Sequence, residues 1–540
     1  MYKVIDLFAG AGGLSFGFVQ TKQFEIKVAF ENSPYIQETY RNNHSNVEVL
    51  GDVCAANYEE IKRKYGDIDV IIGGPPCQGF SNANRQKNHA INQNNMLVKE
   101  YLRAIKELKP QAFVMENVSM LKSDVHRFYM TNKDNEDVLR YEIPTKCTPL
   151  VLLDEQYKFD GALDIIQDPQ QIASYLWNEN EYNILNVIFR ASRNVSKQKK
   201  ALQKHEEEIK KIAKKYSEIP DTGHITMESK KAFLALSDYY EGKLAINEIQ
   251  KQIEPAVMIQ RMLNKALEIH DNNIKVESYS SDKNIVANIY SFSVFDYLKN
   301  TLEKMDDGYV INSGVLCAAD FGAPQKRMRF IVVGIKKSIS SDITLPKGQF
   351  HKDEYRTVRD AIGDLEEIVP VFDLTEEEKG ICLPDKAVSS ELAKYLRDSK
   401  ILRNHIITRT TPVAMERFKV LKQGENFHSL AESMKINTFS DASRTQNTVY
   451  LRLNYNEPCG TVVNVRKSMW VHPTLNRAVS VREAARLQTF PDSFVFYGTK
   501  DKQYQQVGNA VPPIMAKAIA EKLAEVLNEN SFKLFKVNER

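Results

Sequence analysis

Short apolar runs alternate with helical stretches along the first 121 residues of the chain. The runs are rich in β-branched residues, and the stretches between them place apolar side chains at helical spacing. This alternation is typical of βαβ units that build a parallel sheet, so we expect an α/β fold. We predict strands over Val4–Phe8, Ile26–Glu31, Val47–Leu50, Val70–Gly73 and Ala112–Glu116, and helices over Pro34–Asn42, Tyr58–Tyr65 and Leu97–Leu108.

A different pattern marks the middle of the chain. Apolar residues follow heptad-like spacings among lysines and glutamates at Val195, Leu202, Ile209, Ile212, Tyr216 and Ile219. A second helical stretch runs from about residue 228 to residue 267, after a break at Pro220–Gly223. We therefore predict a helical hairpin in this part of the chain.

Composition narrows the class of protein. At 540 residues the chain is too long for one simple core, and we expect two or three domains. Hydrophobic residues make up 42% and charged residues 26%, as in soluble globular proteins, and no apolar run could span a bilayer. The net charge of +3 neither requires nor excludes nucleic acid. The six cysteines form no CxxC pair, so neither a zinc site nor a disulfide framework is indicated. The chain starts with a strand-like segment and no signal peptide, so we expect a cytoplasmic protein.

The first predicted strand runs into a glycine-rich turn, Asp6-Leu-Phe-Ala-Gly-Ala-Gly-Gly13. Glycine there lets a ligand approach the backbone, and the helix behind it offers free N–H groups. The dinucleotide fingerprint fails because Ser15 stands at the place of its third glycine, which favours another adenosine-bearing ligand. Glu31 after the second strand could accept from both ribose hydroxyls, and Asp52 after the third could accept from an adenine amino group. Either acid alone would more often be a loop residue or a helix cap.

The loop Gly73-Gly-Pro-Pro-Cys77-Gln-Gly-Phe-Ser81 follows the apolar run Ile68–Ile72. Two glycines and two prolines indicate a shaped loop at the carboxyl edge of the sheet, where α/β folds bind ligands. Taken alone, Cys77 would more often be a packing residue. The next strand closes on Glu116-Asn117, however, which places a carboxylic acid at the same edge. No histidine lies in either segment, so a Cys–His hydrolase is the poorer interpretation.

Six segments of the chain resemble, in order, the motifs of the DNA (cytosine-5) methyltransferase family. They are the glycine-rich turn after Asp6, Gly74-Pro-Pro-Cys-Gln-Gly-Phe-Ser81, Met115-Glu-Asn-Val118, Ala319-Asp-Phe-Gly-Ala-Pro-Gln-Lys-Arg-Met-Arg329, Arg482-Glu-Ala-Ala-Arg-Leu-Gln-Thr-Phe-Pro-Asp492 and Gln506-Val-Gly-Asn-Ala-Val-Pro-Pro513. The resemblance covers the two ends of the chain, and the number and order of the segments argue against a chance match.

The resemblance implies a chemistry for the cysteine and the acid. A thiolate at Cys77 would add to C6 of cytosine and make C5 nucleophilic, so that C5 attacks the methyl group of S-adenosylmethionine. Glu116 would hold or protonate N3 of the ring. The C5 proton would then leave to a base that the sequence does not identify, with water or hydroxide as candidates. Because C5 and C6 are shielded inside a stacked duplex, the resemblance also implies base flipping.

Two arginines complete the catalytic set that the resemblance implies, which is Cys77, Glu116, Arg327 and Arg329. The arginines alternate along a strand predicted over Met328–Gly334, so we expect both side chains on one side of it. One would support the flipped base and its phosphates, and the other the loops of Cys77 and Glu116. Without the preceding Pro-Gln-Lys they would be interpreted as solvated charges on an edge strand.

The resemblance implies S-adenosyl-L-methionine as the cofactor and no metal. The expected cofactor-binding residues are Asp6, Phe8, Gly10, Gly12, Gly13, Glu31, Asp52, Pro76, Leu97 and Asn509, with Phe8 covering the adenine ring. Asn509 is expected to be a hydrogen-bonding hinge, and the helix after Pro513 to pack beside the first strand. The segment Asn92–Leu97 departs from the family's usual Asp-x-Arg-Asn-x-Leu pattern because it lacks the Asp and the Arg.

The expected fold is α/β, a Rossmann-like class I methyltransferase with a mostly parallel sheet, a smaller target-recognition domain and a helical insertion. The expected domains are 1–124, 291–339 and 479–540 for the catalytic domain, 125–290 for the helical insertion and 340–478 for the target-recognition domain. Lysines of the insertion are candidates for DNA phosphate contacts, but Glu206–Glu208 lies among them, and we favour a solvated helix face. In the target-recognition region we expect short strands. The candidates for guanine contacts there are Arg444, Arg452 and Arg466, and each could equally well contact a phosphate.

The sequence therefore predicts a DNA (cytosine-5-)-methyltransferase that acts on a specific double-stranded DNA sequence, as the modification enzyme of a bacterial restriction-modification system. We expect a monomer on DNA, no membrane association, and a cognate restriction endonuclease that acts separately. A tRNA cytosine methylase of the same architecture is the nearest alternative, but that group tends to be shorter and carries a Cys-Phe-Thr signature that this chain lacks. A catalytically silent DNA-binding relative is disfavoured by the intact Cys77, Glu116 and Arg327.

Overall fold

The computed structural model describes residues 1–76, 94–117, 127–385, 387–388, 390–435 and 445–538. Within these residues the chain divides into two compact units. The first unit contains the described residues up to 117 and those from 302 onward, and the second contains 127–301. Among these residues, no helix combines the length and the apolar character needed to cross a membrane.

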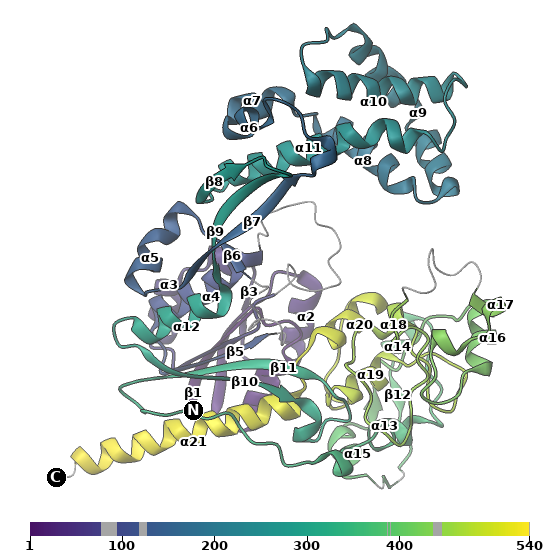
Figure 1. The fold of residues 1–540 in the computed structure, drawn as a ribbon. Coiled ribbons are helices and arrows are strands. Elements are labelled where there is room, and N and C mark those ends of the chain that lie inside the picture. The colour runs from purple at the N-terminus through teal and green to yellow at the C-terminus, as the bar shows by residue number, and fades with distance from the viewer. Residues whose placement is uncertain (77–93, 118–126, 386, 389, 436–444, 539–540) are drawn as a thin grey trace. The chain divides into compact units, whose positions relative to one another are not determined.

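A seven-stranded sheet forms the centre of the first unit (Figure 1). Its order is β10 (Tyr309–Cys317), β11 (Met328–Lys336), β5 (Ala112–Asn117), β4 (Val70–Gly73), β1 (Tyr2–Leu7), β2 (Phe24–Phe30) and β3 (Glu48–Leu50). Neighbours from β5 to β3 are parallel, and β11 is antiparallel to both β5 and β10. The mostly parallel sheet of the predicted fold class is confirmed. The strand order reverses between β1 and β4, which is where open α/β sheets bind ligands.

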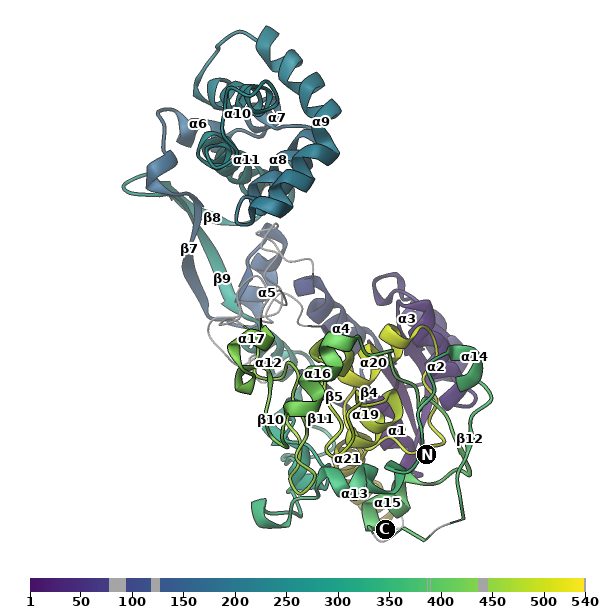
Figure 2. The same ribbon diagram turned by 90° about the vertical axis from the view of Figure 1, so that its right-hand side faces the viewer.

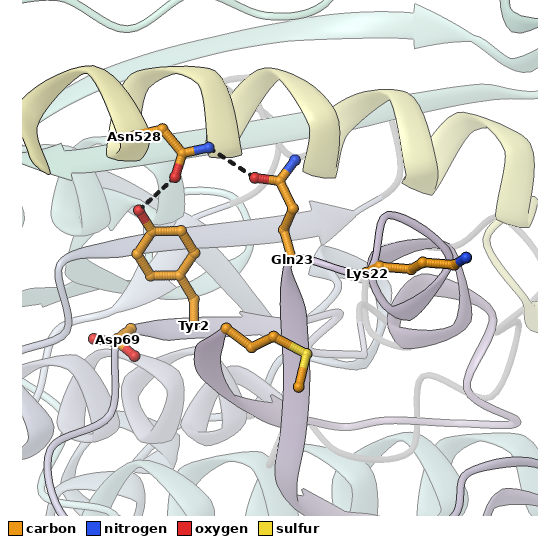
Figure 3. A pocket seen from close by; sticks show the side chains of 6 residues that line it. Tyr2, Lys22, Gln23, Asp69 and Asn528 are labelled. Atoms are coloured by element: carbon orange, nitrogen blue, oxygen red, sulfur yellow. Dashed lines mark hydrogen bonds between the residues drawn. The ribbon is translucent and has the colours of Figure 1, made fainter. Parts of the chain in front are cut away.

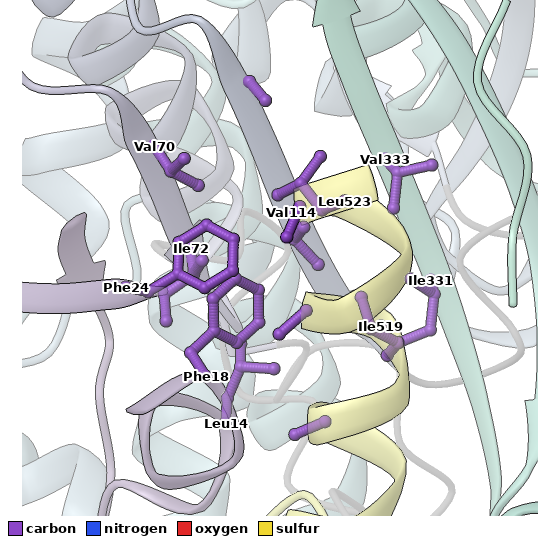
Figure 4. Packing of buried hydrophobic residues seen from close by; sticks show 14 of the residues in the cluster. Leu14, Phe18, Phe24, Val70, Ile72, Val114, Ile331, Val333, Ile519 and Leu523 are labelled. Atoms are coloured by element: carbon purple, nitrogen blue, oxygen red, sulfur yellow. The ribbon is translucent and has the colours of Figure 1, made fainter. Parts of the chain in front are cut away.

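Helices cover both faces of this sheet. They are α1 (Gly13–Gln20), α2 (Pro34–Asn43), α3 (Tyr58–Tyr65), α4 (Asn94–Leu108) and α21 (Pro513–Asn538). α1 and α21 pack side by side (Figure 2), and Phe18, Ile519 and Leu523 form one core with the strands beneath them (Figure 4). Side chains alternate along a strand, so Phe113 points to the other face, where its ring centroid lies 6.5 Å from that of Tyr101 on α4.

The C-terminal helix meets the first strand, as the resemblance led us to expect. The Tyr2 hydroxyl donates to Oδ1 of Asn528 over 2.9 Å, and the amide of Asn528 donates to Oε1 of Gln23 over 2.7 Å. Gly17 allows this helix pair to pack closely, because a Cβ at that position would lie 2.5 Å from the Cβ of Ala516. The two ends of the chain are therefore parts of one core.

Short elements make up the rest of the first unit. The helices are α13 (Val358–Ile362), α14 (Leu374–Glu377), α15 (Glu391–Leu396), α16 (Pro412–Val420), α17 (Glu432–Lys435), α18 (Val465–Ser468), α19 (Val481–Leu487) and α20 (Lys500–Asn509). The strands β12 (Ile381–Cys382) and β13 (Ile401–Leu402) pair antiparallel. Helices thus outweigh the short strands that we expected here. Ala11, Trp470 and Phe490 share one core, so the predicted target-recognition and catalytic domains lie in one unit, and their boundaries stay predictions.

The second unit combines a small antiparallel sheet with helices (Figure 1). Its strands are β6 (Arg127–Tyr129), β7 (Thr145–Leu153), β8 (Val276–Ser280) and β9 (Ile285–Ser293), and all three others pair with β9. Its helices are α5 (Asn135–Arg140), α6 (Ala162–Gln167), α7 (Pro169–Tyr175), α8 (Glu179–Ala191), α9 (Val195–Glu218), α10 (His224–Tyr240), α11 (Ile249–Asp271) and α12 (Val294–Lys304). The division between the two units falls inside α12.

The first helix of the predicted hairpin is confirmed, and the second was wrong as a single element. α9 buries Leu202, Ile209, Ile212 and Tyr216 of the apolar stripe that the spacing predicted, but Val195 at its start is 54% exposed. The stretch from residue 228 to residue 267 is divided instead between α10 and α11. The division follows from Gly242, whose φ of 74° is a left-handed conformation that ends a helix.

Candidate active site

The glycine-rich turn lies at the carboxyl end of β1, where the strand order reverses. Phe8 and Gly10 have φ angles of 58° and 56°, and Gly12 has a φ of 92°. A Cβ on Gly10 would meet nothing within 4 Å, so the backbone there faces open space. A Cβ on Gly12 would lie 2.3 Å from Nε2 of His44. Only glycine therefore fits at position 12, because of the left-handed backbone and because of the His44 ring beside it.

Two carboxylates follow β2 and β3. Glu31 accepts hydrogen bonds from the N–H groups of Gly10 (3.1 Å) and Ser33 (2.8 Å), and its burial raises its pKa. Asp52 is exposed and accepts from the N–H of Cys54 over 2.9 Å, which caps a short 3₁₀ turn. Glu31 therefore lies directly beside the glycine-rich turn. Asp52 has the capping role that a lone acid often has, and its contact to an adenine amino group stays a prediction.

The other expected cofactor residues lie on separate elements. Phe8 is half-buried behind β1, Pro76 is half-buried after β4, and Leu97 is half-buried on α4. Gly13 begins α1, and a Cβ there would lie 2.4 Å from a backbone carbonyl oxygen. Asn509 ends α20 and is exposed. Their contacts to a cofactor stay predictions.

Asp6, the remaining expected cofactor residue, lies beneath the turn rather than on its surface. Only 1% of the residue is exposed. The Tyr40 hydroxyl lies 3.1 Å from Oδ2 of Asp6 and 2.9 Å from Oγ of Ser15, and the Ser15 hydroxyl donates to the Gly12 carbonyl over 3.1 Å. Burial raises the pKa of Asp6 to about 7. Asp6 can thus act on a ligand through these groups but not by open contact.

Glu116 and Arg329 form an ion pair at the carboxyl end of β5. Arg329 Nε lies 2.6 Å from Glu116 Oε1, and the two side chains are only 14% and 13% exposed. A Cβ on Gly74 would lie 2.9 Å from Glu116 Oε2, so the glycine lets the chain pass against the carboxylate. The amide of Asn117 donates to the carbonyl of Pro75 over 3.0 Å. These contacts join the end of β5 to the start of the loop that carries Cys77, which itself lies outside the described residues.

Arg327 lies deeper than its neighbour. Its residue is 1% exposed, and its guanidinium donates to the carbonyls of Val462 (2.8 Å) and Gly508 (3.0 Å). Burial and the nearby charge of Arg329 lower its pKa. Within the described residues its Nε has no hydrogen-bond partner. Arg327 therefore holds two backbone segments together, whereas Arg329 holds the acid.

A buried amide pair extends this connection. Gln325 donates to the carbonyl of Leu487 (2.9 Å) and to Oε1 of Gln488 (2.6 Å), and it accepts from the N–H of Val462 over 3.1 Å. Gln488 donates in turn to the carbonyl of Val507 over 2.7 Å. Four segments that are apart in the sequence, at Gln325, Val462, Gln488 and Val507, thus meet at one buried point.

The three arginines proposed to read guanine have different positions. Arg452 was a wrong candidate, because it is 3% exposed and donates to the carbonyls of His472 (2.8 Å) and Leu475 (3.1 Å). Arg466 is exposed and pairs with Asp501, with Nη1 and Oδ1 2.8 Å apart. Arg444 lies outside the described residues. Arg466 thus stays a candidate for DNA contact.

A depression of about 500 Å³ lies on the first unit away from this chemistry (Figure 3). Tyr2, Gln23 and Asp69 line it, and they lie at or just before the amino ends of β1, β2 and β4. The glycine-rich turn and Glu116 lie at the carboxyl ends of the strands. The depression is therefore at the opposite edge of the sheet, and we assign it no role.

Sequence reasoning missed the polar residues that support the turn. Tyr40 on α2 and His44, which caps the C-terminal end of α2, lie four residues apart and stack with their ring centroids 4.2 Å apart. This i, i+4 spacing could have indicated that the two rings share a face. Their contacts to Ser15 and Asp6, on other elements, carry no sequence signal of that kind.

Comparison with known proteins identifies the family. The model of the C-5 cytosine-specific DNA methylases matches residues 2–146 and 283–525. The type II methyltransferase M.DdeI of Desulfomicrobium norvegicum is 24% identical over 537 residues, which cover 96% of this chain and 88% of that protein. The DNA (cytosine-5-)-methyltransferase M.ApeKI of Aeropyrum pernix is 27% identical over 557 residues, which cover 98% of this chain and 99% of that protein.

A solved structure shares the fold. It is a protein encoded within an Escherichia coli prophage and described as a DNA modification methyltransferase, with a TM-score of 0.52 and 22% identity over 98% of this chain and all of that one. The sheet, the glycine-rich turn and the paired acid thus define a Rossmann-like methyltransferase. The chain belongs to the C-5 cytosine-specific DNA methylase family and is a DNA (cytosine-5-)-methyltransferase. Enzymes of this family use S-adenosylmethionine.

Proposed function

We propose that this enzyme methylates C5 of cytosine within a specific double-stranded DNA sequence through a covalent bond between Cys77 and C6. The observation that supports this best is the ion pair of Glu116 and Arg329 beside Gly74. It fixes a carboxylate at the base of the loop that carries the cysteine.

The proposed reaction assigns one task to each group. The Cys77 thiolate adds to C6, and the electron pair that this addition releases makes C5 nucleophilic. Glu116 holds N3 and stabilises the charge on the ring, while Arg329 fixes the orientation of its carboxylate. S-adenosylmethionine supplies the methyl group that C5 attacks. Loss of the C5 proton to a base then reforms the C5–C6 double bond and expels the thiolate. Arg327 positions the Val462 and Gly508 segments behind this site.

Base flipping is part of the proposal, because C5 and C6 are out of reach inside a duplex. A fluorescent adenine analogue opposite or beside the target cytosine should brighten when the enzyme binds, since the base that leaves the stack no longer quenches it. Unchanged fluorescence with tight, sequence-specific binding would contradict base flipping.

The proposed cofactor site is the glycine-rich turn with Glu31 and Asp52. The residues fit an adenosine-bearing ligand, because open space lies at Gly10 and a carboxylate lies beside it. Loss of a charged hydrogen bond should weaken S-adenosylmethionine binding by roughly 1.5–3 kcal/mol in Glu31→Ala and in Asp52→Ala. Calorimetry that finds unchanged affinity in both variants would remove this placement.

Trapping with a modified substrate tests the covalent step. DNA with 5-fluorocytosine at the target should form an adduct that survives denaturant, because fluorine cannot leave as the C5 proton does. Cys77→Ala should form none, and Glu116→Gln should form it slowly. A stable adduct in Cys77→Ala would show that the nucleophile is another residue.

Tritium transfer from labelled S-adenosylmethionine tests the substrate. We expect label in double-stranded DNA and none in tRNA, which would also distinguish the enzyme from a silent DNA-binding relative. We further propose that the enzyme is a monomer on DNA in the cytoplasm and is the modification partner of a restriction endonuclease, as the relatives named type II methyltransferases suggest. Cleavage protection of DNA from cells that express the enzyme would test the last point.

Sequence choice is proposed to depend on residues 340–478. The catalytic residues contact the flipped cytosine and its phosphates, which every site supplies, so a different surface must contact the neighbouring base pairs. Exchanging this region with that of a relative of different specificity should transfer the methylated sequence. If the recipient keeps its own sequence, recognition lies elsewhere.

A further inference from the structure

A chain of buried polar groups connects Asp6 to the backbone of the glycine-rich turn. Asp6 lies at the end of β1, Tyr40 on α2 and Ser15 on α1, and they are 1%, 0% and 0% exposed. The links are Asp6 Oδ2 to Tyr40 Oη (3.1 Å), Tyr40 Oη to Ser15 Oγ (2.9 Å) and Ser15 Oγ to the Gly12 carbonyl (3.1 Å). The chain therefore ends on a backbone group of the proposed cofactor site.

The direction of this chain depends on one proton. The Tyr40 hydroxyl has a single hydrogen and two neighbours, Asp6 and Ser15, that can accept it. When Asp6 is protonated it can donate to Tyr40, Tyr40 to Ser15, and Ser15 to the Gly12 carbonyl, so each group is satisfied. When Asp6 is ionised, the Tyr40 hydroxyl must donate to it, and Ser15, which also hydrogen-bonds to Asp6, no longer receives a hydrogen from Tyr40.

Burial and the charge of Glu31 favour the protonated form of Asp6 in the protein without ligand, whereas its hydrogen-bond partners favour the ionised form. Glu31 adds a second negative charge, which raises the pKa of Asp6, whereas hydrogen bonds from Ser15 on α1 and Tyr40 on α2 lower it. Tyr101 approaches Asp6 from α4. His44 lies 3.5 Å from Ser15 Oγ, and burial lowers its pKa to about 4, so it is neutral near pH 7. Burial is the largest effect on Asp6 and raises its pKa to about 7. A small change in local charge can thus change its protonation under ordinary conditions.

We propose that Asp6 is a positioning residue that distinguishes the cofactor from its product by charge, being ionised with S-adenosylmethionine and protonated with S-adenosylhomocysteine. The inference rests on the proposed function, which places the cofactor at the glycine-rich turn. The methyl donor carries a sulfonium cation, which stabilises a nearby carboxylate. The product carries a neutral thioether, so Asp6 recovers its proton when the methyl group has left. The difference would favour release of the product over release of the cofactor as the pH rises.

Calorimetry of the full-length protein tests this coupling. The dissociation constants of S-adenosylmethionine and S-adenosylhomocysteine are measured from pH 6 to pH 8, and their ratio is taken because the amino and carboxyl groups that both ligands share then cancel. If binding of the cofactor releases one proton from a group with a pKa near 7, its affinity relative to the product should rise by about tenfold over this range. Heats measured in buffers of different ionisation enthalpy should show proton release for the cofactor alone.

Two variants and a control separate the role of Asp6 from a general disturbance. Asp6→Asn should make the affinity ratio independent of pH. Tyr40→Phe removes a donor that stabilises the ionised carboxylate, so it should keep the pH dependence but shift its midpoint upward. Asp69→Asn changes a carboxylate at the opposite edge of the sheet, which accepts from the N–H of Lys3 over 2.8 Å, and should leave the ratio as in the unaltered protein.

The outcomes distinguish the inference from the proposed function. Failure of the unaltered protein to bind either ligand would contradict the cofactor site itself. Binding of both ligands with a ratio that does not change between pH 6 and pH 8 would overturn the role of Asp6 alone. A pH dependence that persists unchanged in Asp6→Asn, or a midpoint unmoved in Tyr40→Phe, would assign the proton to another group.

Discussion

Arg327 and Arg329 show how two residues of one motif differ in their tasks. Arg329 is partly exposed and pairs with Glu116, whereas Arg327 is buried and holds the carbonyls of Val462 and Gly508. Both were expected to be catalytic on the basis of the resemblance. The contacts fit a positioning role for both, because Arg329 orients the Glu116 carboxylate, and the guanidinium of Arg327, a residue that is 1% exposed, cannot reach a substrate without rearrangement.

Glu116→Gln should separate chemistry from binding. The amide keeps the shape of the side chain but loses the charge, so methyl transfer should slow by about 100-fold or more. Affinity for S-adenosylmethionine should change little, because Glu116 lies at the end of β5, whereas the glycine-rich turn, Glu31 and Asp52 follow β1, β2 and β3. Single-turnover transfer and calorimetry measure the two quantities. Equal losses in both would mean that the variant damages the fold or that Glu116 contacts the cofactor.

Asp6→Asn should change how stability depends on pH. The folded protein raises the Asp6 pKa from 3.8 to about 7, so between these values it binds a proton more tightly than the unfolded chain does. The contribution of Asp6 to stability is therefore present at low pH and is lost as the pH rises toward 7. Chemical denaturation measures the free energy of unfolding of both proteins from pH 4 to pH 8. As the pH increases, the stability of the variant should rise relative to that of the unaltered protein. A constant difference would contradict the buried, protonated Asp6.

Residues that depend on their own strand could be predicted, and residues that depend on remote partners could not. Glu31 and Glu116 lie at the carboxyl ends of strands that share one edge of the sheet, so their position follows from the βαβ pattern. Arg452 was misjudged because its partners, the carbonyls of His472 and Leu475, become neighbours only after folding. The sequence gives no sign that an arginine in an Asn- and Thr-rich region is buried.

At the scale of elements, Arg452 should be important for stability rather than for specificity. Arg452→Ala leaves buried carbonyl oxygens without donors and should destabilise the protein by about 3 kcal/mol or more. The methylated DNA sequence should not change. Arg466→Ala is the matched control, since Arg466 is exposed and its ion pair is worth at most about 1 kcal/mol. A relaxed recognition sequence in a stable Arg452→Ala protein would restore Arg452 as a base-reading residue.

Two glycines of the glycine-rich turn, Gly10 and Gly12, can be compared within one element. Gly12→Ala combines left-handed strain, roughly 1–2 kcal/mol, with overpacking against His44, roughly 1–3 kcal/mol. Gly10→Ala carries the strain alone, because open space surrounds its Cβ position. Thermal and urea unfolding should therefore show the larger loss for Gly12→Ala. Equal losses would mean that the ring of His44 moves aside without cost.

Element boundaries were predictable where the pattern is local. β4 and α3 begin and end at the predicted residues, since β-branched runs and caps define them. The break between α10 and α11 was missed because only the left-handed conformation of Gly242 shows it. The strands of the second unit were also missed, although β9 alternates buried and half-buried residues along most of its length. A helical interpretation of the surrounding sequence obscured that alternation.

At the scale of the whole molecule, separate cores explain how the chain accommodates a large insertion. The two largest cores of the first unit draw their buried residues from positions up to 114 and from 318 onward, with none between 130 and 290. Two cores of the second unit lie between residues 152 and 289. The family model leaves out residues 147–282, which lie within the second unit. The resemblance in the two ends of the chain is thus sufficient to predict the catalytic fold without any account of the insertion.

Removal of residues 130–290 should therefore leave a folded and active enzyme. Tyr129 of β6 and Ser291 of β9 face each other on adjacent antiparallel strands, so an Asn-Gly turn can join them directly. Phe128 and Phe292 would keep their contact with each other and with Tyr297. We expect cooperative unfolding, the same methylated sequence and measurable methyl transfer that Cys77→Ala abolishes in the shortened protein. A folded product that binds S-adenosylmethionine but transfers no methyl group to DNA would instead make the insertion part of the DNA-binding surface, and the lysines of α9 would then be the first residues to replace.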